Sequence, residues 1–203
     1  YVPDLSVPLY TRKNASRPTK GSVEIDGKTI GSMADSQMAD FRNHKIGFVF
    51  QSFHLIPSLT VADNVELPLT YRKGLSASER KRRVKEVLDA VGLSHRAGHY
   101  PSQLSGGQSQ RVAIARAIVG DPDIILADEP TGSLDSRNRD DIRSIITDLR
   151  ARHKQTFLIV THDPTVADIA DRTVMMADGR ITEIITRATA QTPLSDPADT
   201  AAL

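Results

Sequence analysis

Three short apolar runs in this chain end in polar side chains that could do chemistry. They are Ile46–Phe50 leading into Gln51, Ile124–Ala127 leading into Asp128 and Glu129, and Phe157–Val160 leading, through Thr161, into His162. Continuous apolar runs of this length are typical of strands buried on both faces of a parallel sheet. The carboxyl ends of parallel strands meet at one sheet edge, where ligands bind in open α/β sheets, so we expect these polar groups to lie together.

Asp128 and Glu129 are adjacent carboxylates at one of these strand ends. Because neighbouring side chains of a strand point to opposite sides, one carboxylate can hold a metal ion while the other faces a water molecule. A site of this kind suits phosphoryl transfer to water, in which the protein contributes positioning and charge rather than covalent steps.

A small-residue turn, Ser105-Gly106-Gly107-Gln108, runs directly into a segment with helical periodicity. The apolar residues of the following stretch, 112–119, recur on one side of that helix. A helix that starts at glycines presents free N–H groups and the positive end of its dipole, which favour an anion. The turn is therefore a candidate anion-binding element.

Composition narrows the class of protein. The 203 residues include 26 basic and 25 acidic side chains, no cysteine and no tryptophan. The near-neutral balance argues against nucleic acid as a partner, and the lack of cysteine excludes disulfides and thiolate metal sites. No apolar run approaches the roughly 20 residues of a membrane span, and the first residues lack the apolar core of a signal peptide. We therefore expect a cytoplasmic protein that meets a membrane through a partner.

Residues 52–103 are predicted to form a helical insertion. Two helix starts are marked by possible capping boxes, Thr60 with Asp63 and Ser76 with Glu79. Gly92 is expected to end the second helix. The second helix begins with a basic run, 80–85, for which a solvated face is favoured over a lipid or nucleic-acid surface.

The remaining segments are predicted more briefly. Residues 1–16 show no periodicity and are left unassigned, and 186–203 are expected to be a disordered tail. Hairpins are expected at the turns Asp26-Gly27 and Asp178-Gly179. Ser136 is expected to cap a helix with one apolar face, and the methionines of the second hairpin are expected to fill core space.

The central motifs resemble those of one family. Leu104–Gln108 (LSGGQ) resembles the signature motif of ATP-binding-cassette (ABC) ATPases, and IILADE with the following Ser133–Asp135 (SLD) resembles their Walker B strand and D-loop. Gln51 and His162 match the Q-loop and H-loop of the family. The segment 48–69 is more specific, since it resembles the subgroup that drives lipoprotein release, macrolide export and antimicrobial-peptide export.

The resemblance implies an α/β fold with a P-loop-NTPase-like parallel sheet core. It covers about 17–185, with a helical subdomain at about 52–118 and an incomplete N-terminal part of the core. By the same resemblance, Asp128 would hold Mg²⁺ through water, and Glu129 would polarise the attacking water as general base. His162 would contact the γ-phosphate of ATP, and Gln51 would complete the metal and water shell.

The resemblance also implies partners. Ser105, Gly106, Gly107 and Gln108 would face ATP held by a second ATPase subunit, identical or different, with Asp135 contacting across the dimer. A transmembrane permease subunit would carry the transported substrate, so the protein would sit peripherally on the inner face of the cell membrane.

One expected motif is absent from the sequence. The family's phosphate-binding P-loop, G-x-x-x-x-G-K-[ST], occurs nowhere in the chain. The strand that would carry it is expected beside Ile124–Ala127. Two hypotheses follow: an ATP-hydrolysing transporter subunit, or a non-hydrolysing cassette that lends only its signature turn to an intact partner's ATP site.

Overall fold

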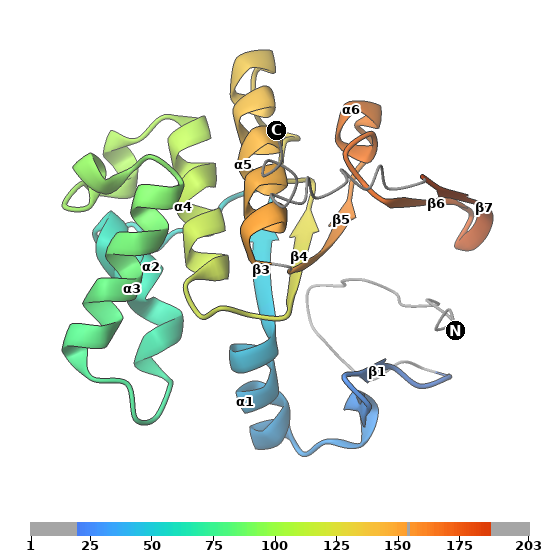
Figure 1. Cartoon of the computed structure of the whole chain (residues 1–203), viewed down its shortest axis with the longest axis horizontal. Coiled ribbons are helices and arrows are strands. Elements are labelled where there is room, and N and C mark those ends of the chain that lie inside the picture. Colours follow the sequence, from blue (N-terminus) through green and yellow to red (C-terminus); the bar gives the residue numbers. More distant parts are fainter. Residues whose placement is uncertain (1–19, 154, 188–203) are drawn as a thin grey trace, which may run out of the picture.

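The computed structural model describes residues 20–153 and 155–187, and its centre is a parallel sheet of three strands (Figure 1). The strands are β3 (Ile46–Phe50), β4 (Ile124–Asp128) and β5 (Thr156–Val160), in the order β3-β4-β5. The register pairs Phe50 with Asp128 and Asp128 with Val160. All three predicted strands are thus present, and their carboxyl ends are level with one another.

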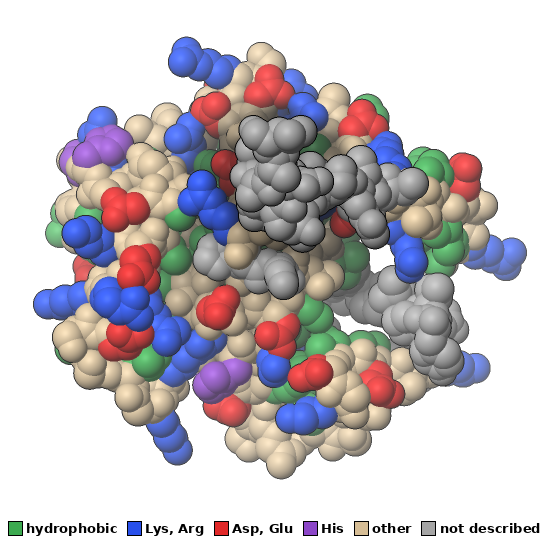
Figure 2. Space-filling view, viewed as in Figure 1, with side chains coloured by type: hydrophobic (Ala, Val, Ile, Leu, Met, Phe, Trp, Pro, Cys, Tyr) green, Lys and Arg blue, Asp and Glu red, His purple; other side chains and the backbone are tan. Residues whose placement is uncertain are grey.

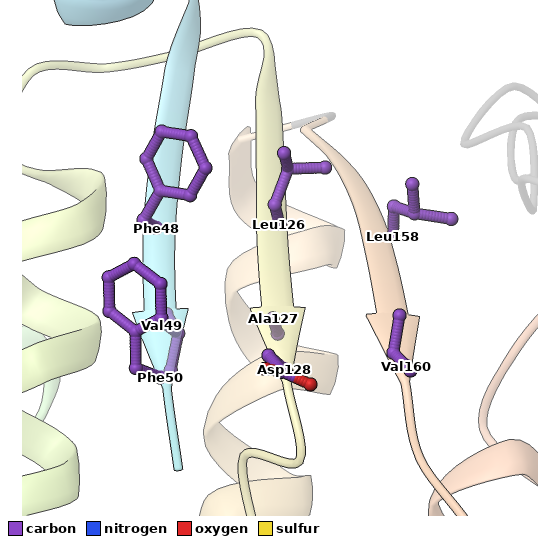
Figure 3. Close-up of a pocket in the computed structure, with 8 residues that line it drawn as sticks. All are labelled: Phe48, Val49, Phe50, Leu126, Ala127, Asp128, Leu158 and Val160. Carbon is purple, nitrogen blue, oxygen red and sulfur yellow. The ribbon is translucent and has the colours of Figure 1, made fainter. Parts of the chain in front are cut away.

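Strand β4 is the central strand, which corrects one expectation. β3 pairs with one of its edges and β5 with the other, so no further strand can lie beside β4. An additional strand could join this sheet only outside β3 or β5. The two faces of the sheet also differ. Val49, Ile125 and Ala127 are buried, whereas the opposite face forms a shallow apolar cavity of about 60 Å³ lined by alternate residues such as Phe48 and Leu126 (Figure 3).

Helices connect and cover the strands. Helix α1 (Asp35–Lys45) runs directly into β3, α4 (Gly106–Ile118) precedes β4, and α5 (Ser136–His153) precedes β5. Helix α4 packs closely on β3. Gly47 permits this approach, since a Cβ at that position would overlap the carbonyl of Ala117. Ile142, Ile146 and Leu149 of α5 are buried, as the predicted apolar face requires.

Two further helices, α2 (Val61–Thr70) and α3 (Ala77–Ala90), lie with α4 to one side of the sheet (Figure 1). Short 3-10 turns, η2 (Ser94–Arg96) and η3 (Pro101–Gln103), connect α3 to α4. Buried residues of all three helices share one core, including Val65, Leu88 and Val112.

The predicted helix starts are present, with one difference in detail. Thr60 and Asp63 exchange the two bonds of a capping box. Ser76 accepts a bond from the Glu79 amide, but the Glu79 carboxylate binds Arg82 and Arg83 instead of reaching back. The charge of the two arginines outcompetes the neutral backbone amide as a partner for the carboxylate.

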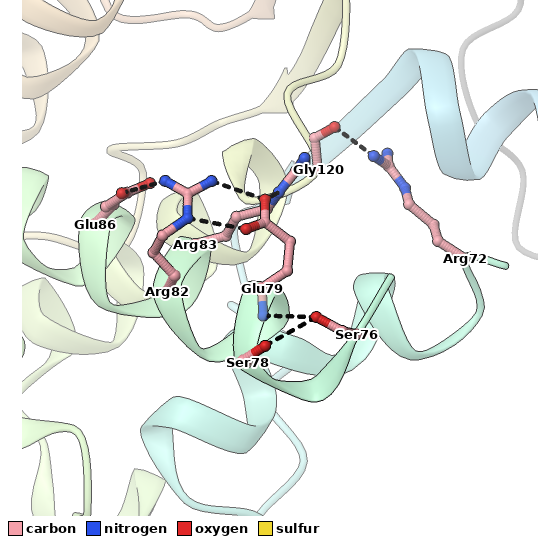
Figure 4. Close-up of polar contacts among 8 residues, drawn as sticks. All are labelled: Arg72, Ser76, Ser78, Glu79, Arg82, Arg83, Glu86 and Gly120. Carbon is pink, nitrogen blue, oxygen red and sulfur yellow. Dashed lines mark hydrogen bonds and ion pairs between the residues drawn. The ribbon is translucent and has the colours of Figure 1, made fainter. Parts of the chain in front are cut away.

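Ion pairs occupy much of the basic run of α3 (Figure 4). Arg80 pairs with Glu66, Arg82 with Glu79 and Glu86, and Arg83 with Glu79. The arginine bonds lower the pKa of Glu79 to about 2. Charges of both signs are interspersed over the face in view (Figure 2). The ion pairs of α3 favour a solvated face over a lipid or nucleic-acid surface.

Two hairpins flank the sheet. Strands β1 (Glu24–Ile25) and β2 (Lys28–Thr29) pair around Asp26-Gly27, with the short turn η1 (Ile30–Ser32) after them. Strands β6 (Arg172–Ala177) and β7 (Arg180–Thr186) pair around the second predicted turn.

The methionine expectation is wrong. Met175 and Met176 are 49% and 56% exposed, because β6 pairs only with β7 among the described residues and this end of the strand is exposed. The unassigned segment predicted at 1–16 lies outside the described residues. The disordered tail was predicted to begin at 186, but Thr186 ends strand β7; residues 188–203 of that tail lie outside the described residues. Within the described ranges, no helix is both long and apolar enough to cross a membrane.

Candidate functional site

The carboxyl edge of the sheet brings Asp128 and Glu129 next to the end of β5. Asp128 ends β4 and is exposed, while Glu129 is the first residue beyond it. The Glu129 amide donates to the Val160 carbonyl at 2.8 Å, and Glu129 has a φ of 45°. A left-handed backbone at a non-glycine residue costs roughly 1–3 kcal/mol, and such strain concentrates at functional sites.

Glu129 and His162 are in direct contact. His162 Nδ1 lies 2.6 Å from Glu129 Oε1, and the His162 amide donates to the same oxygen at 3.0 Å. The Thr161 hydroxyl donates to Glu129 Oε2 at 3.2 Å. The Glu129 side chain is 20% exposed and that of His162 is 83% exposed. A carboxylate has about four acceptor positions, so Glu129 retains room for a water molecule.

Gln51 reaches the same edge from the end of β3. A Cβ at Gly132 would lie 3.0 Å from Gln51 Nε2 and 3.3 Å from Glu129 Cβ. The absence of a side chain at Gly132 therefore lets Gln51 approach the loop that carries Glu129. The structure places four residues at the sheet edge at which the sequence predicted them: Gln51, Asp128, Glu129 and His162.

The turn Ser105–Gln108 forms the start of α4. Ser105 Oγ accepts from the Gln108 amide at 3.3 Å, and Gln108 Oε1 accepts from the Ser105 amide at 2.9 Å. This capping box occupies two amides, and Gly106 lies close to Leu134, since its Cβ would be 3.6 Å from Leu134 Cδ2. The turn thus contacts the segment that leads to Asp135 within the same chain.

Asp135, rather than Ser136, caps α5, which corrects the predicted cap. Asp135 Oδ1 accepts from the Asn138 amide at 2.9 Å, and Oδ2 accepts from Asn138 Nδ2 at 2.8 Å. These bonds lower the pKa of Asp135. The Asn138 amide group also covers Gly107, where a Cβ would overlap it. Asp135 and Ser136 are both residue types that favour an N-cap, and the prediction chose the wrong one of the two.

Two polar residues of α4 that were not predicted from the sequence contact the loops of the site. Gln110 donates to the Pro130 carbonyl, and Arg116 donates to the carbonyls of Phe53 and His54. The sequence does carry a signal for both residues: a glutamine and an arginine lie inside a largely apolar helix, where an unpaired polar group is costly and so needs a partner.

The structure offers no substitute for the missing phosphate loop among its described residues. The sequence Gly21 to Thr29 contains a Gly-Lys-Thr triplet, but five residues separate its glycines instead of four. Lys28 and Thr29 form strand β2, whereas a phosphate loop leads into a helix.

The donor set of the sheet edge fits Mg²⁺. No cluster of three or more Asp, Glu or His side chains suited to a metal occurs in the described ranges. Mg²⁺ prefers oxygen ligands and is commonly held by one or two carboxylates together with water and substrate phosphates. The exposed Asp128 carboxylate meets that requirement, and Gln51, which follows the neighbouring strand β3, carries an amide oxygen that suits the same ion.

Comparison with known proteins extends these observations. A family model described as ABC transporter matches residues 10–132, more than half of the chain. The lipoprotein-releasing system ATP-binding protein LolD of Bacteroides fragilis is 48% identical over 164 residues, covering 81% of this chain and 76% of that protein. The macrolide export ATP-binding/permease protein MacB 1/2 of Paracoccus denitrificans is 49% identical over 165 residues, which are 81% of this chain and 24% of that protein.

A solved structure shows the same fold. The ATP-binding cassette MJ0796, in a dimeric post-hydrolysis state bound to ADP and Pi, matches with a TM-score of 0.76 and 44% identity. The match covers 84% of this chain and 75% of that one. It confirms the predicted ABC-type α/β core, and none of these similarities supports a cassette that only lends its signature turn. The chain belongs to the ABC transporter family, as one of its ATP-binding, ATP-hydrolysing subunits.

Proposed function

We propose that this subunit powers export or lipoprotein release through a transmembrane permease, and that hydrolysis takes place at the carboxyl edge of the sheet. The observation that carries the site is the level register of β3, β4 and β5, which gathers Gln51, Asp128, Glu129 and His162. The names of LolD and MacB support the class of transport.

Glu129 is the general base of this proposal. Its carboxylate is half-buried and held by His162 and Thr161, so its orientation is fixed before a water molecule arrives. Fixed orientation is what a base needs, because proton transfer requires hydrogen-bond reach to the attacking water. His162 Nε2 is left free of the Glu129 contact and can donate to a γ-phosphate oxygen when both ring nitrogens carry a proton.

Asp128 and Gln51 would hold Mg²⁺ in this proposal. When bound, the ion would neutralise charge on the β- and γ-phosphates of ATP. Asp128 is exposed at the strand end, and Gln51 lies against the Glu129 loop. Both side chains could therefore hold an ion bound beside Glu129.

We assign the start of α4 to the nucleotide of a second subunit. The glycines keep side chains away from the first turn, and Ser105, Gly106, Gly107 and Gln108 present the positive helix end to an anion. Asp135 would contact across the same dimer. The dimeric state of the related cassette supports this arrangement. The helices of about 52–118 would then form the subdomain that meets the permease, with the subunit held peripherally at the membrane.

ATP turnover with Mg²⁺ tests the assignment of the base. The chain is assayed alone and mixed with a related cassette that carries its own P-loop but has its signature serine replaced by Arg. In the arm with the chain alone, we expect Glu129→Gln to lower turnover by at least about 100-fold while binding of a fluorescent ATP analogue persists. Glu183→Gln, on exposed strand β7, is the matched control.

The two arms separate the possible results. Turnover in the mixture that depends on Ser105, together with no Glu129-dependent turnover of the chain alone, would show a chain that lends its signature turn without hydrolysing ATP. Unchanged turnover in both Glu129→Gln and Ser105→Arg would overturn the proposed site.

A further inference from the structure

Helix α4 holds the loop behind Glu129 through a buried amide. Gln110 is fully buried, and its Nε2 donates to the Pro130 carbonyl at 2.7 Å. Pro130 directly follows Glu129, whose backbone is left-handed. A single buried bond from α4 therefore reaches the residue that follows the candidate base.

The same helix holds the loop behind Gln51 through a charged group. Arg116 Nη1 donates to the His54 carbonyl at 2.6 Å, and Nη2 donates to the Phe53 carbonyl at 2.7 Å. Phe53 and His54 have φ values of 58° and 48°, so two successive residues adopt a conformation that is unfavourable outside glycine. Burial of the guanidinium lowers the pKa of Arg116, as expected for a cation enclosed by protein.

The two contacts leave α4 in different directions. Residues six positions apart on an α-helix are separated by about 9 Å along the axis and about 120° around it. Gln110 and Arg116 thus attach two separate loops to one rigid body. The start of that body is the turn Ser105–Gln108, and a Cβ at Gly106 would lie 3.9 Å from the Phe53 ring.

We propose that Gln110 and Arg116 are positioning residues that tie Gln51 and Glu129 to the signature turn through α4. A displacement of the turn by a nucleotide on a second subunit would then move both loops together. The catalytic meaning of this coupling rests on the proposed function, whereas the coupling itself is a property of the fold.

Hydrogen exchange at single amides tests the coupling without any nucleotide. Arg116→Met removes the donors that hold the carbonyls of Phe53 and His54, and we expect at least tenfold faster exchange of the amides in that loop. Gln110→Leu is expected to do the same to the amides of Gly132 and Leu134, with little effect on the first loop. Arg116→Lys keeps the charge with fewer, less directed donors and is expected to rescue part of the protection.

The control is another arginine with the same kind of contacts. Arg72 donates to the carbonyls of Gly120 and Asn43, away from both loops. Arg72→Met is expected to leave exchange in both loops unchanged. If Arg116→Met and Arg72→Met accelerate the two loops equally, the contacts serve only global stability and the proposal is overturned. It is overturned as well if neither α4 variant changes exchange in its own loop.

A fluorescence measurement gives an independent reading. The chain has no tryptophan, so Ser52→Trp introduces a single indole beside Gln51. Arg116→Met should lower the anisotropy of that indole, and Gln110→Leu should not. If the α4 variants loosen the loops but Glu129→Gln leaves turnover unchanged, the proposed function is refuted and the coupling still stands. Loosening together with a lower kcat and a nearly constant KM would support both.

Discussion

Replacing Gly107 by alanine should destabilise the protein through one identifiable contact. The new Cβ would overlap the Asn138 amide group, which is held in place by Asp135. Overpacking of this kind costs about 1–3 kcal/mol, while alanine is favoured over glycine in a helix by about 0.5–1 kcal/mol. We expect a net loss of about 1 kcal/mol in the free energy of unfolding, measured from urea midpoints.

Two comparisons isolate the cause of that loss. Gly106→Ala lies one residue earlier, where the nearest atom would be 3.6 Å away, and should be neutral or stabilising by up to about 1 kcal/mol. In an Asn138→Ala background the overlap with the amide group is gone and the Cβ of residue 138 stays at 3.1 Å, so Gly107→Ala should become neutral or stabilising by up to about 1 kcal/mol. A coupling energy below about 0.5 kcal/mol between positions 107 and 138 would refute the steric argument.

Three further outcomes are expected. Gly47→Ala places a Cβ on a carbonyl of α4 and should lower the free energy of unfolding by about 3 kcal/mol in urea titrations, while Gly31→Ala, with open space around it, should change it little. The pKa of Glu79 is lowered from 4.5 to about 2, so its ion pairs stabilise the fold above pH 4.5 and this contribution is lost as the pH falls toward 2. Melting temperatures of the wild type and Glu79→Gln should therefore converge on acidification. Thr161→Val removes a donor to Glu129 and should lower turnover about tenfold with ATP-analogue binding retained.

The sequence predicted the strands and the edge at which the site lies, because apolar runs and parallel topology are local and repetitive signals. It also predicted the capping box at Thr60. The sequence was less informative where two adjacent residues suit the same role. Asp135 and Ser136 are both good caps, and only the position of Asn138 decides for the first.

Other misses concern contacts distant in sequence. Nothing local indicates that Met175 faces solvent, because its exposure follows from where strand β6 finds a partner. The central position of β4 also follows from pairing on both of its edges, which periodicity does not report. The bond between Glu129 and His162 joins residues 33 apart, and it required the two strand ends to be level.

The strained residues of the site indicate where its geometry is controlled. Phe53 follows Gln51 by two positions and Glu129 follows Asp128 directly, and both have left-handed backbones. Each such residue costs roughly 1–3 kcal/mol and persists only where its surroundings fix it. Part of that fixation comes from α4, at Arg116 and beside Glu129 at Pro130. Substitutions on the inner side of α4 should therefore change catalysis without touching nucleotide, and they should do so by relaxing these backbones rather than by removing a catalytic group.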